Sequence, residues 1–277
     1  MLEAPEARII ARQLNQTVKG MTITYVSAGY TPHKFTWYHE GAESYEAKML
    51  GKVVGETHSY GGLVEIEIED VRLLFGDGVN LRYYAAGAKL PPKHQLLLGL
   101  DDGSCLVASV RMYGGIMCFS PENFESTFKP YYEKARNKPQ VLGNDFTKDY
   151  FDRLFDDAAA AKKSAKAFLA TGQSIPGLGN GVLQDILYNA GVHPKTKIAT
   201  LSEEQRYAMY DSTVATLREM EAKGGRNSES DLYGNSGGYV PYLSKDTAGH
   251  ECIRCGAIII KENYMGGSIY YCPGCQR

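Results

Sequence analysis

Four cysteines near the end of the printed sequence constrain this chain more than any other feature. They are Cys252, Cys255, Cys272 and Cys275, two C-x2-C pairs separated by sixteen residues. Each pair can direct two thiolates at one ion, and four thiolates complete a tetrahedron without leaving a position for water. The spacing therefore predicts one structural Zn²⁺ in a finger, whose middle segment has the pattern of a β-hairpin. Two disulfides or free thiols are the alternatives.

Length and charge narrow the class of protein. With 277 residues, 43% of them hydrophobic, the chain can bury one large core or two medium ones. The formal net charge of -2 means that a nucleic-acid binder of this kind would have to concentrate its cations locally. No apolar run approaches the roughly 18 residues of a membrane span, and the first residues lack a secretion signal. We expect a cytoplasmic protein without membrane contact.

The hydrophobic pattern divides the chain into parts of different periodicity. Residues 1–15 have helical spacing, and residues 20–119 are short strand-like runs separated by Gly and Asp turns. Helical patterns return after residue 150, and one of them opens on a Ser202-x-x-Gln205 capping box. The predicted fold class is α+β. Its expected parts are a leading helix with a β-sandwich domain (1–120), an interdomain connection (121–150), a helical domain (151–225), a flexible loop (226–248) and the zinc finger (249–277).

A glycine-rich turn separates two of the expected helices. It runs from Ser174 to Gly181, and Asn180 stands where the second helix would begin. Such a turn can offer backbone N–H groups at a helix N-terminus to a phosphate, so Gly179 and Asn180 are candidate binding residues. An ordinary helical hairpin is the alternative. The loop that follows the helical domain contains Tyr233, Tyr239 and Tyr242, which could stack on a base or only pack the loop.

The order of these elements resembles the formamidopyrimidine-DNA glycosylase and endonuclease VIII family over essentially the whole chain. The resemblance implies a helix-two-turn-helix domain, DNA between the two domains, and a nucleotide flipped out of the duplex. In that family an N-terminal proline amine attacks the sugar C1′ and forms a Schiff base, assisted by two carboxylates. The carboxylates match Glu3 and Glu6 in this sequence. Acidic residues in the first turn of a helix also favour its dipole, which is the alternative role.

This sequence departs from the family pattern at four positions. Leu2 stands where the proline would be, and its bulk should keep Met1 in place. The alignment puts Gly61 at the position of a phosphate-binding lysine and Gly267 at that of the finger arginine. The methionine that fills the void left by base flipping falls near Asp77.

Other residues match the family's DNA contacts. Lys166 precedes Asn180 by fourteen residues, a spacing similar to that of the family's phosphate-binding pair. Arg111, Met112 and Tyr113 resemble the turn that wedges into the duplex, with Met112 in place of arginine and Tyr113 in place of phenylalanine. The alternative is that Met112 and Tyr113 belong to the core face of a strand.

Two functions follow from these matches and departures. The first is a glycosylase that binds damaged duplex DNA as a monomer at the nucleoid and hydrolyses the N-glycosidic bond without strand cleavage, with Glu3 activating water. The Met1 amine, or a lysine from elsewhere, could restore amine chemistry. The second is a catalytically inactive DNA-damage-binding protein of the same fold. A protein-protein adaptor built on the zinc hairpin explains the finger but not Glu3, Lys166 and Asn180 together.

Overall fold

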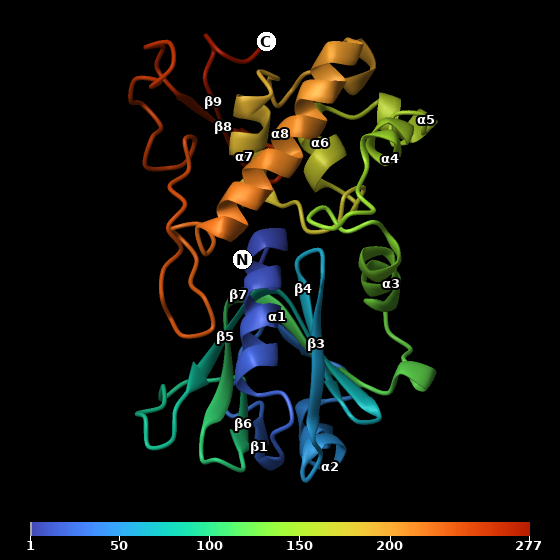
Figure 1. Cartoon of the computed structure of the whole chain (residues 1–277), viewed down its shortest axis with the longest axis vertical. Helices are drawn as coiled ribbons and strands as arrows, with labels where there is room; N and C mark the ends of the chain where they lie inside the picture. The colour runs from blue at the N-terminus through green and yellow to red at the C-terminus, as the bar shows by residue number, and fades with distance from the viewer. Residues whose placement is uncertain (1) are drawn as a thin grey trace.

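The computed structural model describes residues 2–277 and shows two lobes that meet at helix α1, Ala4–Thr17 (Figure 1). Pro5 lies in the first turn of α1, where its missing N–H removes no helical hydrogen bond. Apolar side chains at helical spacing, among them Ile10 and Leu14, are buried against the β lobe. Helix α1 therefore belongs to the core of the first lobe, while its first turn lies at the junction with the second.

The first lobe is built on one seven-stranded sheet. The strand order is β1-β6-β7-β5-β4-β3, and β2 pairs in parallel with β7. The strands are β1 (Ile23–Ala28), β2 (Thr36–Tyr38), β3 (Val54–Tyr60), β4 (Leu63–Ile68), β5 (Val71–Tyr84), β6 (Leu96–Leu100) and β7 (Cys105–Phe119). The sequence shows two separate strand-like runs in the place of β5 and two in the place of β7. Each is one continuous strand in the structure, because the β5–β7 pairing shifts its register between Asp77 and Val79 and then continues.

The segment 121–150 is more than a connection. It contains η2 (Pro121–Asn123), helix α3 (Lys129–Asn137) and the beginning of α4 (Lys148–Arg153). Phe124 and Tyr132 are buried with Leu74 and Phe119 in a second apolar cluster of the β lobe. The hydroxyl of Tyr132 donates to the buried carboxylate of Glu65 at 2.5 Å. These few aromatic anchors were too sparse in the sequence to predict a packed segment.

The second lobe consists of short helices around one long helix. Its elements are α4, α5 (Ala158–Ala161), α6 (Ala165–Ala170), α7 (Asn180–Asn189), η3 (Ile198–Thr200), α8 (Glu203–Ala222) and the hairpin β8 (Ile260–Tyr264) and β9 (Gly267–Tyr271). The remaining elements, η1 (Ala42–Ser44) and α2 (Tyr45–Met49), belong to the first lobe. The predicted capping box is present, since Ser202 accepts from the Gln205 N–H and the Gln205 side chain accepts from the Ser202 N–H. None of the helices in residues 2–277 has the length and apolar character of a membrane span.

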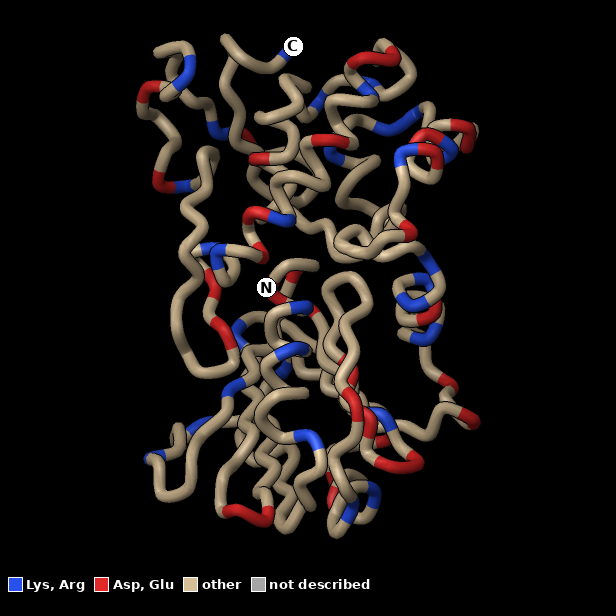
Figure 2. The backbone as a smooth tube through the Cα atoms, viewed as in Figure 1, with Lys and Arg blue, Asp and Glu red and all other residues tan. Residues whose placement is uncertain are grey.

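Backbone contacts join the two lobes beside α1. The β3–β4 hairpin turns at Gly61, whose φ is +59°, and its tip lies against the glycine-rich turn. A Cβ at Gly61 would lie 2.6 Å from the Gly177 nitrogen, and one at Gly62 would lie 2.8 Å from the Leu2 oxygen. A lysine at position 61, which the resemblance would place there, could not be accommodated without moving the lobes apart. Basic and acidic residues are interspersed over both lobes (Figure 2), as the near-zero net charge suggests.

We predict that Gly61→Ala destabilises the protein more than Gly87→Ala. Both glycines have positive φ, so each substitution costs about 1–2 kcal/mol of backbone strain. Only Gly61 meets backbone atoms of the other lobe, whereas a Cβ at Gly87 has nothing within 4 Å. Thermal unfolding of both variants measures the difference, and equal losses would mean that the lobes separate freely at this contact.

Candidate functional site

Glu3 connects the N-terminal segment to helix α7. Its side chain is only 3% exposed, and its two carboxylate oxygens accept from the N–H groups of Gly181, at 2.9 Å, and Val182, at 2.8 Å. These N–H groups lie in the first turn of α7, where no partner within the helix is available and the helix dipole favours negative charge. Glu3 thus caps a helix of the other lobe, and its position is fixed by two hydrogen bonds.

Glu6 lies one turn further along α1 and binds Arg226, which follows the C-cap glycines of α8. The pair is bidentate, with Nε to Oε1 and Nη2 to Oε2 both at 2.9 Å. The Arg226 backbone N–H also donates to Glu6, at 3.2 Å, and its Nη1 lies 3.4 Å from Glu3 Oε2. All three side chains are buried. No local pattern indicates the role of Arg226, because its partners lie more than 200 positions earlier in the chain.

Burial and charge act in opposite directions on the pKa values of this cluster. Burial raises the pKa of Glu3, and the Glu6 charge adds to that rise, while Arg226 and the two backbone N–H groups oppose it. Burial would lower the pKa of Arg226, but Glu3 and Glu6 together raise it. The guanidinium therefore stays charged, and Glu3 holds a proton more readily than an exposed glutamate does.

The glycines of the turn make room for this cluster. A Cβ at Gly179 would lie 2.5 Å from Glu3 Oε1, and one at Gly181 would lie 1.5 Å from Arg226 Nη1. The sequence predicted that the turn leaves N–H groups for a phosphate. Because Glu3 occupies those of Gly181 and Val182, a ligand at this helix end would have to use Gly179 and Asn180, which line the adjoining cavity.

That cavity, with a volume of about 520 Å³, lies between the lobes. Leu2 and Glu3 line it, and the Leu2 N–H donates to the Asp77 carbonyl at 2.9 Å. The nitrogen at the position of the family's amine is thus a hydrogen-bonded peptide N–H, while Met1 lies outside the described residues. Lys134 also lines the cavity and donates to the Gly172 carbonyl. The other lining residues are Gly62, Asp77, Tyr113, Pro130, Tyr131, Ala170, Gly172, Gln173, Ile175, Gly177, Leu178, Gly179 and Asn180.

Asp77 adds a carboxyl group whose importance the sequence did not reveal. It lies in the left-handed region, with φ of +57°, at the irregularity of β5. Its side chain lines the 520 Å³ cavity and a neighbouring hollow, and burial raises its pKa. The Asp77-Gly78 pair inside a strand-like run was the available signal, because such a pair marks a bulge.

Lys166 and Asn180 meet at the finger hairpin. The Lys166 ammonium donates to the Tyr264 carbonyl at 2.6 Å, and the Asn180 amide donates to the Ser268 carbonyl at 2.8 Å. Both groups surround Gly267, since a Cβ there would lie 3.6 Å from Lys166 Nζ and 3.7 Å from Asn180 Nδ2. The position aligned with the family's finger arginine is therefore beside these two polar side chains, but it has no side chain of its own.

The wedge residues interrupt the pairing of β7 with β5. The register passes from Gly114 opposite Asp77 to Val110 opposite Val79, so Arg111, Met112 and Tyr113 have no ladder partners. The Met112 side chain is 68% exposed, which excludes it from the core and removes the alternative role for this residue. Tyr113 is partly buried and lines the large cavity.

The segment 226–248 links both lobes through hydrogen bonds. The Tyr239 hydroxyl and the Leu243 N–H donate to the buried Asp185 of α7, each at 2.8 Å, and the Tyr83 N–H donates to the Leu232 carbonyl at 2.9 Å. Tyr239 is buried, so it packs the segment instead of offering a face for stacking. Figure 1 shows the segment descending from α8 along β5. Ser228, Glu229 and Ser230 line a 180 Å³ cavity with Leu2, Glu6, Ile10, Gly78, Val79, Asn80, Leu81, Arg82, Arg111, Met112 and Tyr113.

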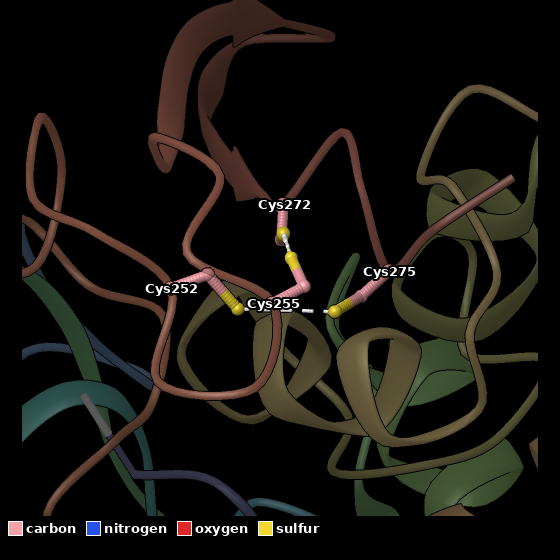
Figure 3. A group of neighbouring side chains, drawn as sticks. All are labelled: Cys252, Cys255, Cys272 and Cys275. Atoms are coloured by element: carbon pink, nitrogen blue, oxygen red, sulfur yellow. Dashed lines mark hydrogen bonds between the residues drawn. The ribbon is translucent and has the colours of Figure 1, made fainter.

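The four finger cysteines face one another (Figure 3), and their sulfur atoms all lie within 4.8 Å. The Cys255–Cys272 and Cys252–Cys275 sulfur pairs are 3.3 and 3.8 Å apart, far beyond a disulfide bond of about 2.05 Å. A tetrahedral zinc with Zn–S bonds of about 2.3 Å places its sulfurs about 3.8 Å apart. The four thiolates therefore fit one structural Zn²⁺.

We predict that Arg226→Met lowers the free energy of unfolding by about 3–5 kcal/mol, because Glu6 is left buried without its partner. The double variant Glu6→Gln, Arg226→Met should recover part of this loss. Lys129→Met, which removes an exposed pair with Glu125, serves as the control and should cost less than about 1 kcal/mol. Denaturant unfolding measures all three, and a loss no larger than the control's would contradict a buried ionic junction.

Asp77→Asn should stabilise the protein near pH 7 and have little effect on stability near pH 4. Because burial raises the folded-state pKa of Asp77 above 3.8, the wild type loses stability as pH rises from 3.8 through that folded pKa. Asparagine keeps the size and tolerates positive φ, but it has no charge to bury. Melting temperatures of both proteins across this pH range test the sign, and a parallel pH dependence would refute it.

Comparison with known proteins finds relatives whose sequences align with the full length of this chain. No protein-family model matches. The formamidopyrimidine-DNA glycosylase of Streptococcus pneumoniae is 25% identical over 283 residues, covering 100% of this chain and 99% of the relative. That of Mycobacterium ulcerans is 28% identical over 299 residues, covering 100% and 98%.

Solved structures of similar proteins share the fold of this chain over its full length. A complex of Lactococcus lactis Fpg with DNA containing an abasic site matches with a TM-score of 0.83 at 25% identity, covering 99% of both chains. A complex of MutM with DNA containing carbocyclic 8-oxo-G matches with a TM-score of 0.81, with the same identity and coverage. The chain is thus similar over its full length, in sequence and in structure, to formamidopyrimidine-DNA glycosylases, and its four-cysteine finger supports the resemblance to the formamidopyrimidine-DNA glycosylase and endonuclease VIII family.

Proposed function

We propose that this protein is a monofunctional DNA glycosylase, which binds damaged duplex DNA between its lobes and hydrolyses the N-glycosidic bond of a flipped nucleotide. One observation supports it most directly. Glu3 lines the cavity between the lobes, while the nitrogen at the amine's position is the Leu2 peptide N–H. Carboxyl chemistry is thus retained at a site where the proline amine is absent.

The proposed DNA contacts come from three places. Exposed Asn180 lies at the finger hairpin beside Lys166, which is 5% exposed and donates to the Tyr264 carbonyl, and Gly179 adds backbone at the edge of the cavity. Exposed Met112 would enter the duplex and fill the space of the flipped nucleotide. Solved structures of Fpg and MutM with damaged DNA support this path, because they share the fold at 99% coverage.

The flipped base would enter the 180 Å³ cavity beside Leu2. That cavity is lined by Glu6 at the level of α1 and by Ser228 and Ser230 from the segment 226–248. Leu2 lines both cavities, so the sugar C1′ would lie close to Leu2 and Glu3 when the base is in the smaller one. Flipping is required because the reacting bond is inaccessible inside a stacked duplex.

Hydrolysis needs only a carboxyl group and water. The bond between C1′ and the base breaks and the water oxygen bonds to C1′, while the carboxylate takes one proton from that water and this proton is passed on to the departing base. Burial raises the pKa of Glu3, so its carboxylate accepts a proton more readily than that of an exposed glutamate. Without an amine at C1′ no Schiff base forms, and the strand should remain intact at the abasic product.

A catalytically inactive damage-binding protein is the second candidate. It is favoured by the hydrogen bonds of Glu3, whose two oxygens already accept from Gly181 and Val182 and face Arg226. A carboxylate held in this way stabilises the junction without any reaction. In either case the protein would act as a monomer in the cytoplasm, at the nucleoid.

The deciding experiment is base release from duplexes carrying oxidised, alkylated and deaminated bases, developed with and without alkali. We expect release that needs alkali to reveal a nick and that falls at least 100-fold in Glu3→Gln. Melting temperature, zinc content and abasic-duplex affinity of Glu3→Gln must stay near wild type, so that loss of folding is not mistaken for loss of catalysis. Binding without release from any base would instead establish the inactive protein.

Borohydride trapping separates the hydrolytic reaction from amine chemistry. A trapped protein-DNA adduct would overturn the monofunctional proposal, and Lys134→Met would show whether the Lys134 amine forms it. If the adduct persists in that variant, Met1 is the next amine to test.

A further inference from the structure

The single tryptophan of the chain lies exposed beside the wedge. Trp37 is 48% exposed on β2, and its ladder partner on β7 is Gly115. Because glycine has no side chain, no cross-strand group covers the indole there. The nearest aromatic partner is Tyr113, whose ring centre lies 6.2 Å from that of Trp37 at an interplanar angle of 55°. Because this contact is tilted, no ring among residues 2–277 lies parallel on the indole.

Other large apolar side chains are exposed around Trp37. Phe35 and Met112 are exposed, and the Phe35 carbonyl accepts from the Gly114 N–H at 3.0 Å, which fixes this strand next to the wedge. We call Phe35, Trp37, Met112 and Tyr113 the Trp37 platform. Lys34 Nζ lies 5.4 Å from the centre of the Phe35 ring, so a cation borders the apolar surface, and exposed Arg111 directly precedes Met112 in the chain. Apolar faces next to cations suit a nucleic acid, whose bases stack and whose phosphates are negative.

A hollow of about 320 Å³ opens beside Trp37. Its wall includes the Phe128 ring and the Asp77 carboxyl, which also lines the large cavity on the other side. The remaining lining residues are Tyr38, His39, Glu40, Gly115, Met117, Ser126 and Thr127. Asp77 thus lines both the space beside Leu2 and the space beside Trp37, and Tyr113 lines the first of them.

We propose that the Trp37 platform binds the base that loses its partner when the damaged nucleotide is flipped out. The inference rests on the proposed DNA binding, and it adds a second recognition site on the opposite strand. With Met112 in the duplex, the flipped nucleotide lies on the Leu2 side and the orphaned base on the Trp37 side. The indole stacks on that base, and the Asp77 carboxyl faces its hydrogen-bonding edge.

The fluorescence of Trp37 tests this directly, because no other tryptophan contributes. Two duplexes carry a tetrahydrofuran abasic site, opposite a normal base in the first and opposite a second tetrahydrofuran in the second. We expect the first to quench Trp37 and the second to bind without quenching. Trp37→Ala should lower the affinity for the first duplex about tenfold, the effect of one lost base-aromatic stack. The affinity for the second duplex should stay unchanged.

Two variants serve as controls for this measurement. Tyr25→Ala removes an exposed aromatic ring from β1, outside the platform, and should leave both affinities unchanged. Met112→Ala should lower the affinity for both duplexes, because the wedge is needed whether or not an opposite base is present. Labelled-DNA anisotropy gives the affinities independently of Trp37.

Each contrary outcome has a separate meaning. Equal quenching by both duplexes, or equal affinities of Trp37→Ala and wild type, would overturn the opposite-strand site while leaving DNA binding intact. Failure of both duplexes to bind would overturn the proposed function and this inference with it. A change in Trp37 fluorescence with protein concentration, in the absence of DNA and without a difference between duplexes, would assign the platform to a second copy of the chain.

Discussion

The arrangement of the two lobes depends on one buried guanidinium with two carboxylates. Glu3 and Glu6 lie three positions apart on the first turns of α1, so both side chains lie on the face toward the second lobe. Arg226 neutralises one of the two charges, and the N-terminus of α7 stabilises the other through two backbone N–H groups. Buried charges are tolerated only when they are paired and hydrogen-bonded, so these contacts fix how α1, α7 and the end of α8 lie together.

This cluster changes the interpretation of the glycine-rich turn. From sequence, Gly179 and Gly181 indicate a backbone that comes close to a phosphate. In the structure each glycine first makes room for a side chain of the protein itself, Glu3 at one position and Arg226 at the other. A motif with glycines at a helix N-terminus shows that something approaches closely, but it does not say whether that group is a ligand or a distant part of the same chain.

The sequence predicts those structural features that depend on residues within one segment. It does not predict features that depend on contacts between distant segments. The finger spacing, the Ser202–Gln205 capping box and the leading helix each depend on residues within one segment, and each is present. Arg226 could not be assigned a partner, because Glu6 lies 220 positions earlier and no local pattern connects them. The continuity of β5 was missed for a related reason, since a bulge at Asp77 is defined by the strand opposite it.

Three of the four departures from the family pattern, at Leu2, Gly61 and Asp77, are physically connected with one another. Without a side chain at Gly61, the β3–β4 hairpin can lie directly against Gly177, which places Gly62 against the Leu2 carbonyl. The Leu2 N–H then donates to Asp77, so the N-terminal segment is held through its backbone on both sides. Replacing Leu2 with proline would remove that N–H, and a lysine at position 61 would push the turn away from the hairpin. Single reversions to the family residues at positions 2 and 61 therefore conflict with this packing, because each contact depends on the next one.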